Sequence, residues 1–166
     1  EIQAIPGFKM VLNLPDKALD GFAVGLTCPK CILTLRWTSL EDYLGSMRSA
    51  YRNHYKRILK KTADLTIRPL EDGSAFDRRL YELYCNVRDS SRVRIERLSQ
   101  AYFQGNMFRL LVAEEAGEPV GFVQLLANGP ELIFEFVGLD YGCNARIPVY
   151  HRLLLEMVDY GIQNGF

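Results

Sequence analysis

Hydrophobic residues recur at spacings of three and four along much of the chain. In residues 38–61 these positions run from Leu40 to Ile58, and a threonine and a serine precede two acidic residues at the start. A polar N-cap followed by acidic residues is typical of the first turn of a helix. The pattern therefore predicts one long amphipathic helix over residues 38–61.

The rest of the chain mixes helical spacing with strict alternation. The predicted elements are a strand at 64–70, helices at 76–87 and 95–103, strands at 107–115, 119–127 and 131–140, and a helix that starts near Pro148. Short connections with glycine join the last three strands, which is typical of antiparallel hairpins. We therefore expect a mixed α+β (α/β) domain whose central, mostly antiparallel sheet is flanked by helices.

Composition narrows the class of protein. The 166 residues suit one domain, and 20 Lys plus Arg balance 20 Asp plus Glu, so no overall charge favours nucleic acid or a membrane surface. Every apolar run is interrupted before the ~18 residues that a membrane span needs. No signal peptide is visible, and four cysteines do not make a disulfide scaffold, so we expect a cytoplasmic protein without a membrane span.

Cys28 and Cys31 have the spacing of a zinc half-site or a redox pair. Zinc needs two further ligands, and the other cysteines and histidines are scattered. A thioredoxin-like pair opens a helix, whereas this pair precedes a strand-like run. We interpret the two residues as small apolar positions and expect no metal.

The polar stretch between the last strand and the last helix is a candidate anion site. It contains Gly142, which allows close backbone approach, and Asn144 and Arg146, which can donate hydrogen bonds. Unpaired N–H groups at a helix N-terminus favour a bound anion. The alternative is a plain strand-to-helix turn.

A basic stripe is the other local signal. Arg48, Arg52, Lys56 and Lys60 are four residues apart, and no acidic residue occurs between Tyr43 and Ala63. Such a stripe is either a solvated face or a contact for phosphate groups.

Four tracts together resemble the GNAT acyltransferase fold, and more closely its FemAB/peptidoglycan-biosynthesis-like branch of bacterial acyltransferases. They are YLGSMRSAYRNHYKRILKK, LYELYCNVRDSSRVRIERLSQAYFQGN, FRLLVAEEAGEPVGFVQLLANGPELIFEFVGLDY and YGIQNGF. The resemblance covers residues 32–166, so residues 1–31 are expected to form an N-terminal segment, either on its own or as part of a preceding half-domain. In that family further strands and a helix follow, and the resemblance implies that the chain ends before them.

The resemblance implies an N-acyltransferase that moves an acyl group from acyl-CoA to a small-molecule amine or peptide, in cell-envelope or peptidoglycan metabolism. A carboxylate on the last strand would act as base, which makes Glu135 the first candidate and Asp140 the second. Glu135 is expected to point opposite to both neighbouring phenylalanines, either buried with a raised pKa or exposed on an outward face. Tyr141 or Tyr150 would protonate the leaving sulfur.

The resemblance also implies binding roles. The donor would contact Val137, Gly142, Asn144 and Arg146, although the usual glycine-rich phosphate pattern is absent. The acceptor pocket would be faced by Arg88, Arg92 and Arg94.

Three alternatives stay open. Fem-type relatives use aminoacyl-tRNA, which the basic residues Arg48, Arg52 and Lys56 would contact. A covalent intermediate on Cys143 lacks a histidine at a recognisable spacing. A GNAT-like domain without catalysis would serve as a binding module.

Overall fold

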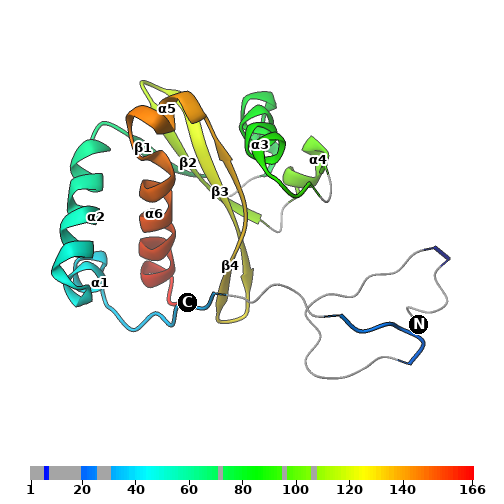
Figure 1. Ribbon diagram of the computed structural model, residues 1–166, viewed down its shortest axis with the longest axis horizontal. Helices are drawn as coiled ribbons and strands as arrows, with labels where there is room; N and C mark the ends of the chain where they lie inside the picture. The colour runs from blue at the N-terminus through cyan, green and yellow to red at the C-terminus, as the bar shows by residue number, and fades with distance from the viewer. Residues whose placement is uncertain (1–5, 8–19, 26–30, 71–72, 95–96, 106–107) are drawn as a thin grey trace. The chain divides into compact units, whose positions relative to one another are not determined.

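The computed structural model describes residues 6–7, 20–25, 31–70, 73–94, 97–105 and 108–166, and the chain divides into two units, Glu1–Thr34 and Leu35–Phe166 (Figure 1). The described residues of the first unit form no helix or strand. All helices and strands below belong to the second unit. Within the described ranges, none of the helices has the length and apolar character that crossing a bilayer requires.

The core of the second unit is a four-stranded antiparallel sheet. Its strands follow one another in chain order: β1 (Thr66–Leu70), β2 (Phe108–Glu115), β3 (Glu118–Asn128) and β4 (Glu131–Leu139). The β2–β3 hairpin turns on Ala116 and Gly117, both with positive φ, at 52° and 85°, as two-residue hairpin turns require. The predicted mixed α+β class with an antiparallel sheet is confirmed.

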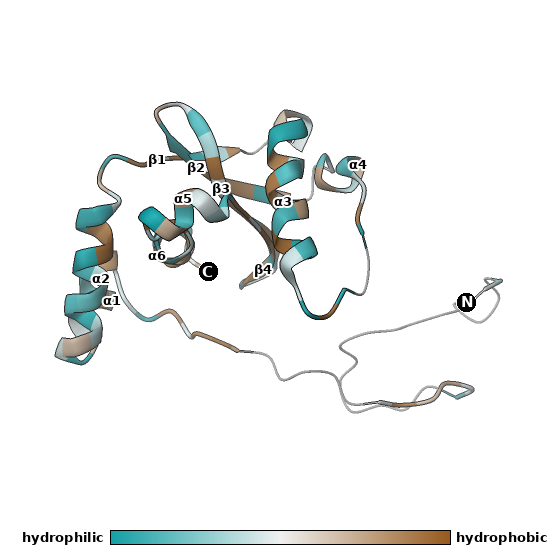
Figure 2. Cartoon of the chain, turned by 45° about the horizontal axis from the view of Figure 1, so that its top comes forward, coloured by the Kyte–Doolittle hydropathy of each residue, from teal (hydrophilic) through white to brown (hydrophobic). Residues whose placement is uncertain are grey.

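Helices cover both faces of the sheet, because each strand alternates its side chains between them. In β2, Leu110 and Val112 join a buried cluster with α3 (Arg78–Ser90) and α4 (Gln100–Phe103). The intervening Leu111 and Ala113 join a second cluster with α6 (Val149–Gln163). Figure 1 shows α3 and α6 on opposite sides of the sheet, and Figure 2 shows hydrophobic strands between them.

A further layer packs on the outer side of α6. It consists of α1 (Leu40–Ser46) and α2 (Ser49–Lys61). Leu44 of α1 and Ile58 of α2 form a small core with Leu155 of α6. The prediction of one helix over residues 38–61 is therefore wrong. Met47 and Arg48 are extended, with ψ of 152° and 145°, and the Arg52 guanidinium donates to the carbonyls of Gly45 and Met47 at 2.9 and 3.4 Å. A side chain thus satisfies carbonyls left open at the break.

Four other elements differ from prediction. The polar stretch after β4 contains a short helix, α5 (Tyr141–Arg146), where we expected an irregular break. Pro148 is the N-cap of α6, which begins at Val149, one residue later than expected. The third predicted helix shortens to α4, and a 3₁₀ turn, η2 (Gly73–Ala75), precedes α3. Residues between β4 and α6 cap both helices that follow β4: Asp140 caps α5, and Asn144 caps α6.

Candidate functional site

The N-terminus of α5 is occupied by the chain's own carboxylate. Asp140 is the N-cap, and its Oδ1 accepts a hydrogen bond from the amide of Cys143 at 3.0 Å. Its Oδ2 lies 2.9 Å from a guanidinium nitrogen of Arg79, whose Nε donates to the carbonyl of Pro119 at 3.2 Å. The first amide groups of this helix therefore already have an anionic partner.

The same contacts determine the charge of Asp140. The amide of Cys143 and the guanidinium of Arg79 hold the pKa of Asp140 below its usual value. A carboxylate with a lowered pKa is a weak base at neutral pH. Asp140 is therefore suited to hold a positive charge, and less suited to remove a proton.

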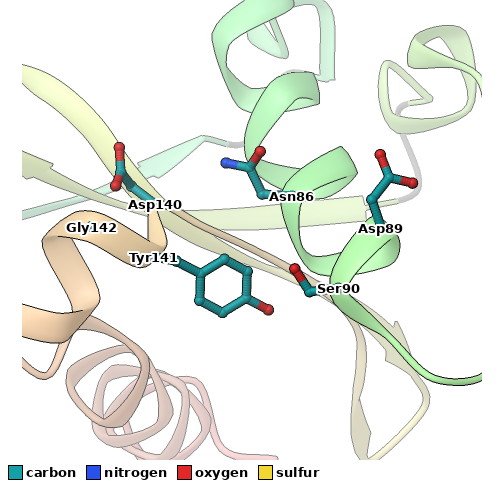
Figure 3. A pocket seen from close by; sticks show the side chains of 6 residues that line it. All are labelled: Asn86, Asp89, Ser90, Asp140, Tyr141 and Gly142. Carbon is teal, nitrogen blue, oxygen red and sulfur yellow. The ribbon is translucent and has the colours of Figure 1, made fainter.

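An open hollow of about 400 Å³ lies beside this cap, and we call it the acidic hollow (Figure 3). Its described lining residues are Asn86, Asp89 and Ser90 of α3, with Asp140, Tyr141 and Gly142. The two carboxylates among them each pair with an arginine that is not in this set, Asp140 with Arg79 and Asp89 with Arg88. In Figure 3 the Tyr141 hydroxyl points toward Ser90. The Asn86 amide donates to the carbonyl of Leu139 at 3.2 Å and so ties α3 to the end of β4. A hollow with this lining suits a protonated amine.

Glu135 lies at an irregularity of β4. Gln124 pairs with Phe136 while the next residue, Leu125, pairs with Phe134, so Glu135 is the extra residue of a β-bulge. Phe136 packs against the α3-side cluster, and Phe134 lies opposite Leu125, a member of the α6-side cluster. The prediction that both phenylalanines share the face opposite Glu135 is therefore wrong, because the bulge interrupts the alternation.

Glu135 also lies away from the acidic hollow along β4. Glu135 is half-buried and lines neither hollow of this site. Five residues of strand separate it from Asp140, which is ~16 Å at the usual rise. Among the described residues it makes no ion pair, so its carboxylate is not committed to a structural partner.

A second hollow of about 410 Å³, the basic groove, lies between α2 and the α5–α6 junction. Its lining is rich in cations and imidazoles: His54, Arg57, Ile58 and Lys61 of α2, with Asn144, Ala145, Arg146, Pro148 and His151. Asn144 caps α6 by accepting from the amide of Tyr150 at 3.0 Å. Two residues of the predicted donor site, Asn144 and Arg146, thus lie in this groove, whereas Gly142 lies in the acidic hollow.

Arg146 has a built-in partner. Its guanidinium meets the two carboxylate oxygens of Glu115 at 2.8 and 3.3 Å, and that hydrogen bond lowers the pKa of Glu115. The thiol of Cys143 also contacts Glu115, and burial followed by the nearby Glu115 charge raises the pKa of Cys143 to about 11. Such a thiol is not a nucleophile at neutral pH.

Most of the remaining predicted site residues pack in the core or bond to other residues of the chain. Tyr150 and Val137 pack against the α6-side cluster and line neither hollow. Arg88 pairs with Asp89 at 2.6 Å, Arg94 donates to the carbonyls of Asp89 and Ser91 near the end of α3, and Arg92 is exposed. Two of the three predicted acceptor-side arginines, Arg88 and Arg94, therefore contact Asp89, which lines the acidic hollow.

The residues of the predicted basic stripe have different surroundings in the structure. Arg52 closes α1, as described above, whereas Arg48 and Lys56 are exposed. The groove takes the neighbouring residues Arg57 and Lys61 instead. Of the cysteine pair, Cys28 lies outside the described residues and Cys31 is exposed. Among the described residues, no cluster of metal-ligating side chains occurs.

Sequence reasoning missed several residues of this region. Arg79, Asn86, Asp89 and Ser90 come from α3, fifty or more positions before the stretch they meet. The helical pattern of α3 carries no signal of that contact. The role of Asp140 as N-cap was the one contact here with a sequence signal, because aspartate commonly precedes a helix. No protein-family model matches the chain, and a search of curated proteins finds no match either.

Proposed function

We propose that this protein is an N-acyltransferase that transfers an acyl group from an acyl-CoA thioester to an amine. The observation that carries the proposal is the acidic hollow at the end of the bulged strand β4. Asp89 and Asp140 offer negative charge to an ammonium group, and Tyr141 offers a hydroxyl. The element order agrees with the GNAT-like resemblance: two helices follow β1 on one face, and the helix after β4 covers the other.

The chemistry requires three proton and charge movements. The amine must lose a proton before its nitrogen attacks the thioester carbonyl, and the resulting oxyanion must be stabilised. The carbon–sulfur bond then breaks, and the leaving thiolate takes a proton. Glu135, ~16 Å along the strand from Asp140, is too far from the hollow to take the amine proton directly or through one water. We therefore assign removal of that proton to solvent water, which reaches the open hollow, and the role of proton donor to Tyr141. Asp89 and Asp140 bind the ammonium form before it is deprotonated.

The structure changes the expected donor contacts. The amide of Cys143 is bonded to Asp140, so the N-terminus of α5 offers fewer free donors to a phosphate than the sequence implies. The donor contacts in this proposal are therefore the side chains of Asn144 and Arg146 in the basic groove. The cell-envelope acceptor implied by the resemblance remains part of the proposal.

Thiol release from acetyl-CoA and longer acyl-CoAs, measured with a panel of primary amines, tests the reaction. Tyr141→Phe should lower kcat by about a hundredfold, as expected for a general acid, and Glu135→Gln should leave kcat unchanged. Glu118→Gln, on an exposed residue at the start of β3, is the matched control and should leave kcat unchanged. Asp89→Asn should raise KM for the amine with little change in kcat. Absence of thiol release with every donor and amine would overturn the proposal.

A second candidate is a GNAT-like binding module without catalysis. The observation that favours it is that Asp140 fills the N-terminus of α5 and Glu115 neutralises Arg146. An aminoacyl-tRNA donor is a third candidate, supported by the exposed Arg48 and Lys56 on α2. Transfer from aminoacyl-tRNA without transfer from acyl-CoA would favour this third candidate.

A further inference from the structure

The basic groove concentrates positive charge from two elements that are far apart in sequence. Arg57 and Lys61 come from α2, and Arg146 comes from α5. Figure 1 shows α2 beside α6, with α5 above α6. Among the described residues that line the groove there is no aspartate or glutamate. Glu115, which does not line the groove, neutralises part of the Arg146 charge. For Arg57 and Lys61 of α2, no described residue of the groove wall supplies a carboxylate.

The groove also holds both histidines of the chain. His54 and His151 are exposed, and their ring centroids lie 5.9 Å apart at an interplanar angle of 84°. Imidazoles supply N–H donors to phosphate oxygens and flat surfaces on which a nucleobase can stack. The groove therefore combines groups for charge with groups for a planar ring.

We propose that the basic groove binds a small phosphate-bearing ligand of the nucleoside diphosphate class. The phosphates contact Arg57, Lys61 and Arg146, because guanidinium and ammonium groups form strong charge-assisted hydrogen bonds with phosphate oxygens. A volume of about 410 Å³ is in the range of small-molecule sites. The site overlaps the donor contacts of the proposed function at Asn144 and Arg146, but it depends mainly on α2.

Two double variants on one helix test the assignment. Arg57→Gln with Lys61→Gln removes the groove cations, and Lys56→Gln with Lys60→Gln removes two exposed cations of α2 that do not line the groove. Both remove the same charge from exposed positions. Thermal unfolding of each variant verifies that the fold is retained.

Calorimetric binding of inorganic pyrophosphate, ADP and a single-stranded RNA oligonucleotide provides the readout. We expect ADP and pyrophosphate to bind the wild type and the Lys56/Lys60 variant equally, and the Arg57/Lys61 variant about tenfold more weakly or worse. Failure of both ADP and pyrophosphate to bind the wild type would overturn the proposal. Equal loss in the two variants, or binding of RNA alone, would also overturn it.

These probes carry no thioester, so the inference and the proposed function can fail separately. Binding of ADP that depends on Arg57 and Lys61, without thiol release in the transfer assay, would retain the groove assignment and remove the acyltransferase. Acyl transfer that is unaffected in the Arg57/Lys61 variant, without ADP binding, would do the reverse.

Discussion

Arg79 on α3 and Asp140 at the start of α5 form an ion pair of 2.9 Å across 61 positions of the chain. The pair joins the helix that covers one face of the sheet to the segment that leads to the other face. Asp140 also caps α5 through the amide of Cys143. One carboxylate thus holds the acidic hollow and the start of the following helix in place.

We expect Asp140→Ala to lower the free energy of unfolding by about 1 kcal/mol, because an N-cap carboxylate and an ion pair are both lost. Asp140→Asn should lower it by less, since asparagine caps a helix as well as aspartate does. Urea denaturation at neutral pH measures both values. An equal loss in the two variants would show that the charge, and not the cap, carries the effect.

The contribution of Asp140 to the free energy of unfolding should depend on pH. The pKa of Asp140 is lowered in the folded protein from its ordinary value of 3.8, so the folded state binds fewer protons than the unfolded state. Its contribution to stability is complete above that ordinary value and is lost as the pH falls through the folded pKa. The difference in unfolding free energy between wild type and Asp140→Asn should therefore shrink on acidification below about pH 4. A difference that stays constant down to pH 2 would contradict this.

Arg152 should contribute more to the free energy of unfolding than an ion pair within one helix would. It pairs with Glu156 at 2.6 Å, and it also donates to the carbonyl and hydroxyl of Thr62 at the end of α2, at 3.0 and 3.2 Å. Thr62 is 1% exposed, so its carbonyl would lose a buried partner. We expect Arg152→Met to lower the free energy of unfolding by about 2 kcal/mol and to speed hydrogen exchange in α2.

The matched control is Arg78→Met. Arg78 forms the same i,i+4 pair with Glu82, but its side chain is 87% exposed. Exposed pairs of this kind contribute only ~0.3–0.5 kcal/mol. Equal effects of the two substitutions would rule out the connection to α2 as the cause.

Gln124 is a buried amide in an otherwise apolar layer. It is fully buried on β3, and neither its Oε1 nor its Nε2 has a hydrogen-bond partner among the described residues. A buried polar group without a partner is destabilising by ~1–3 kcal/mol. We expect Gln124→Met, which has a similar shape, to raise the free energy of unfolding by about 1 kcal/mol in chemical denaturation. A loss of stability would instead show that the amide has a bonded partner in solution, such as a buried water.

Gly138 marks a close approach between β4 and α3. A Cβ at this position would lie 2.1 Å from a ring carbon of Phe122 and 2.9 Å from the Cβ of Leu83. We expect Gly138→Ala to destabilise the protein by about 3 kcal/mol or more, because both neighbours are fully buried. Gly45→Ala on α1, where a Cβ meets nothing within 4 Å, is the control and should be neutral or stabilising. Similar melting temperatures for the two variants would contradict the packing described here.

The local pattern was sufficient for most elements and for the class of fold. Alternation predicted β1 to β4, and short glycine-containing connections predicted their antiparallel pairing, because both signals depend on residues close in sequence. The spacing of Leu80, Leu83 and Tyr84 likewise predicted α3. The same reasoning failed at Met47, where the helix ends because a side chain from the next helix closes its carbonyls.

The sequence by itself determined which residues carry charge near β4, and only the tertiary structure decided how that charge is distributed. Asp140, Asn144 and Arg146 stand within one short polar stretch. Folding brings α3 to the first and α2 to the other two, so one stretch lines hollows of opposite charge. Glu135 shows the same limit, because a bulge depends on the register of two strands. Contacts between distant segments are set by packing and pairing, and a periodicity read along one segment contains no record of them.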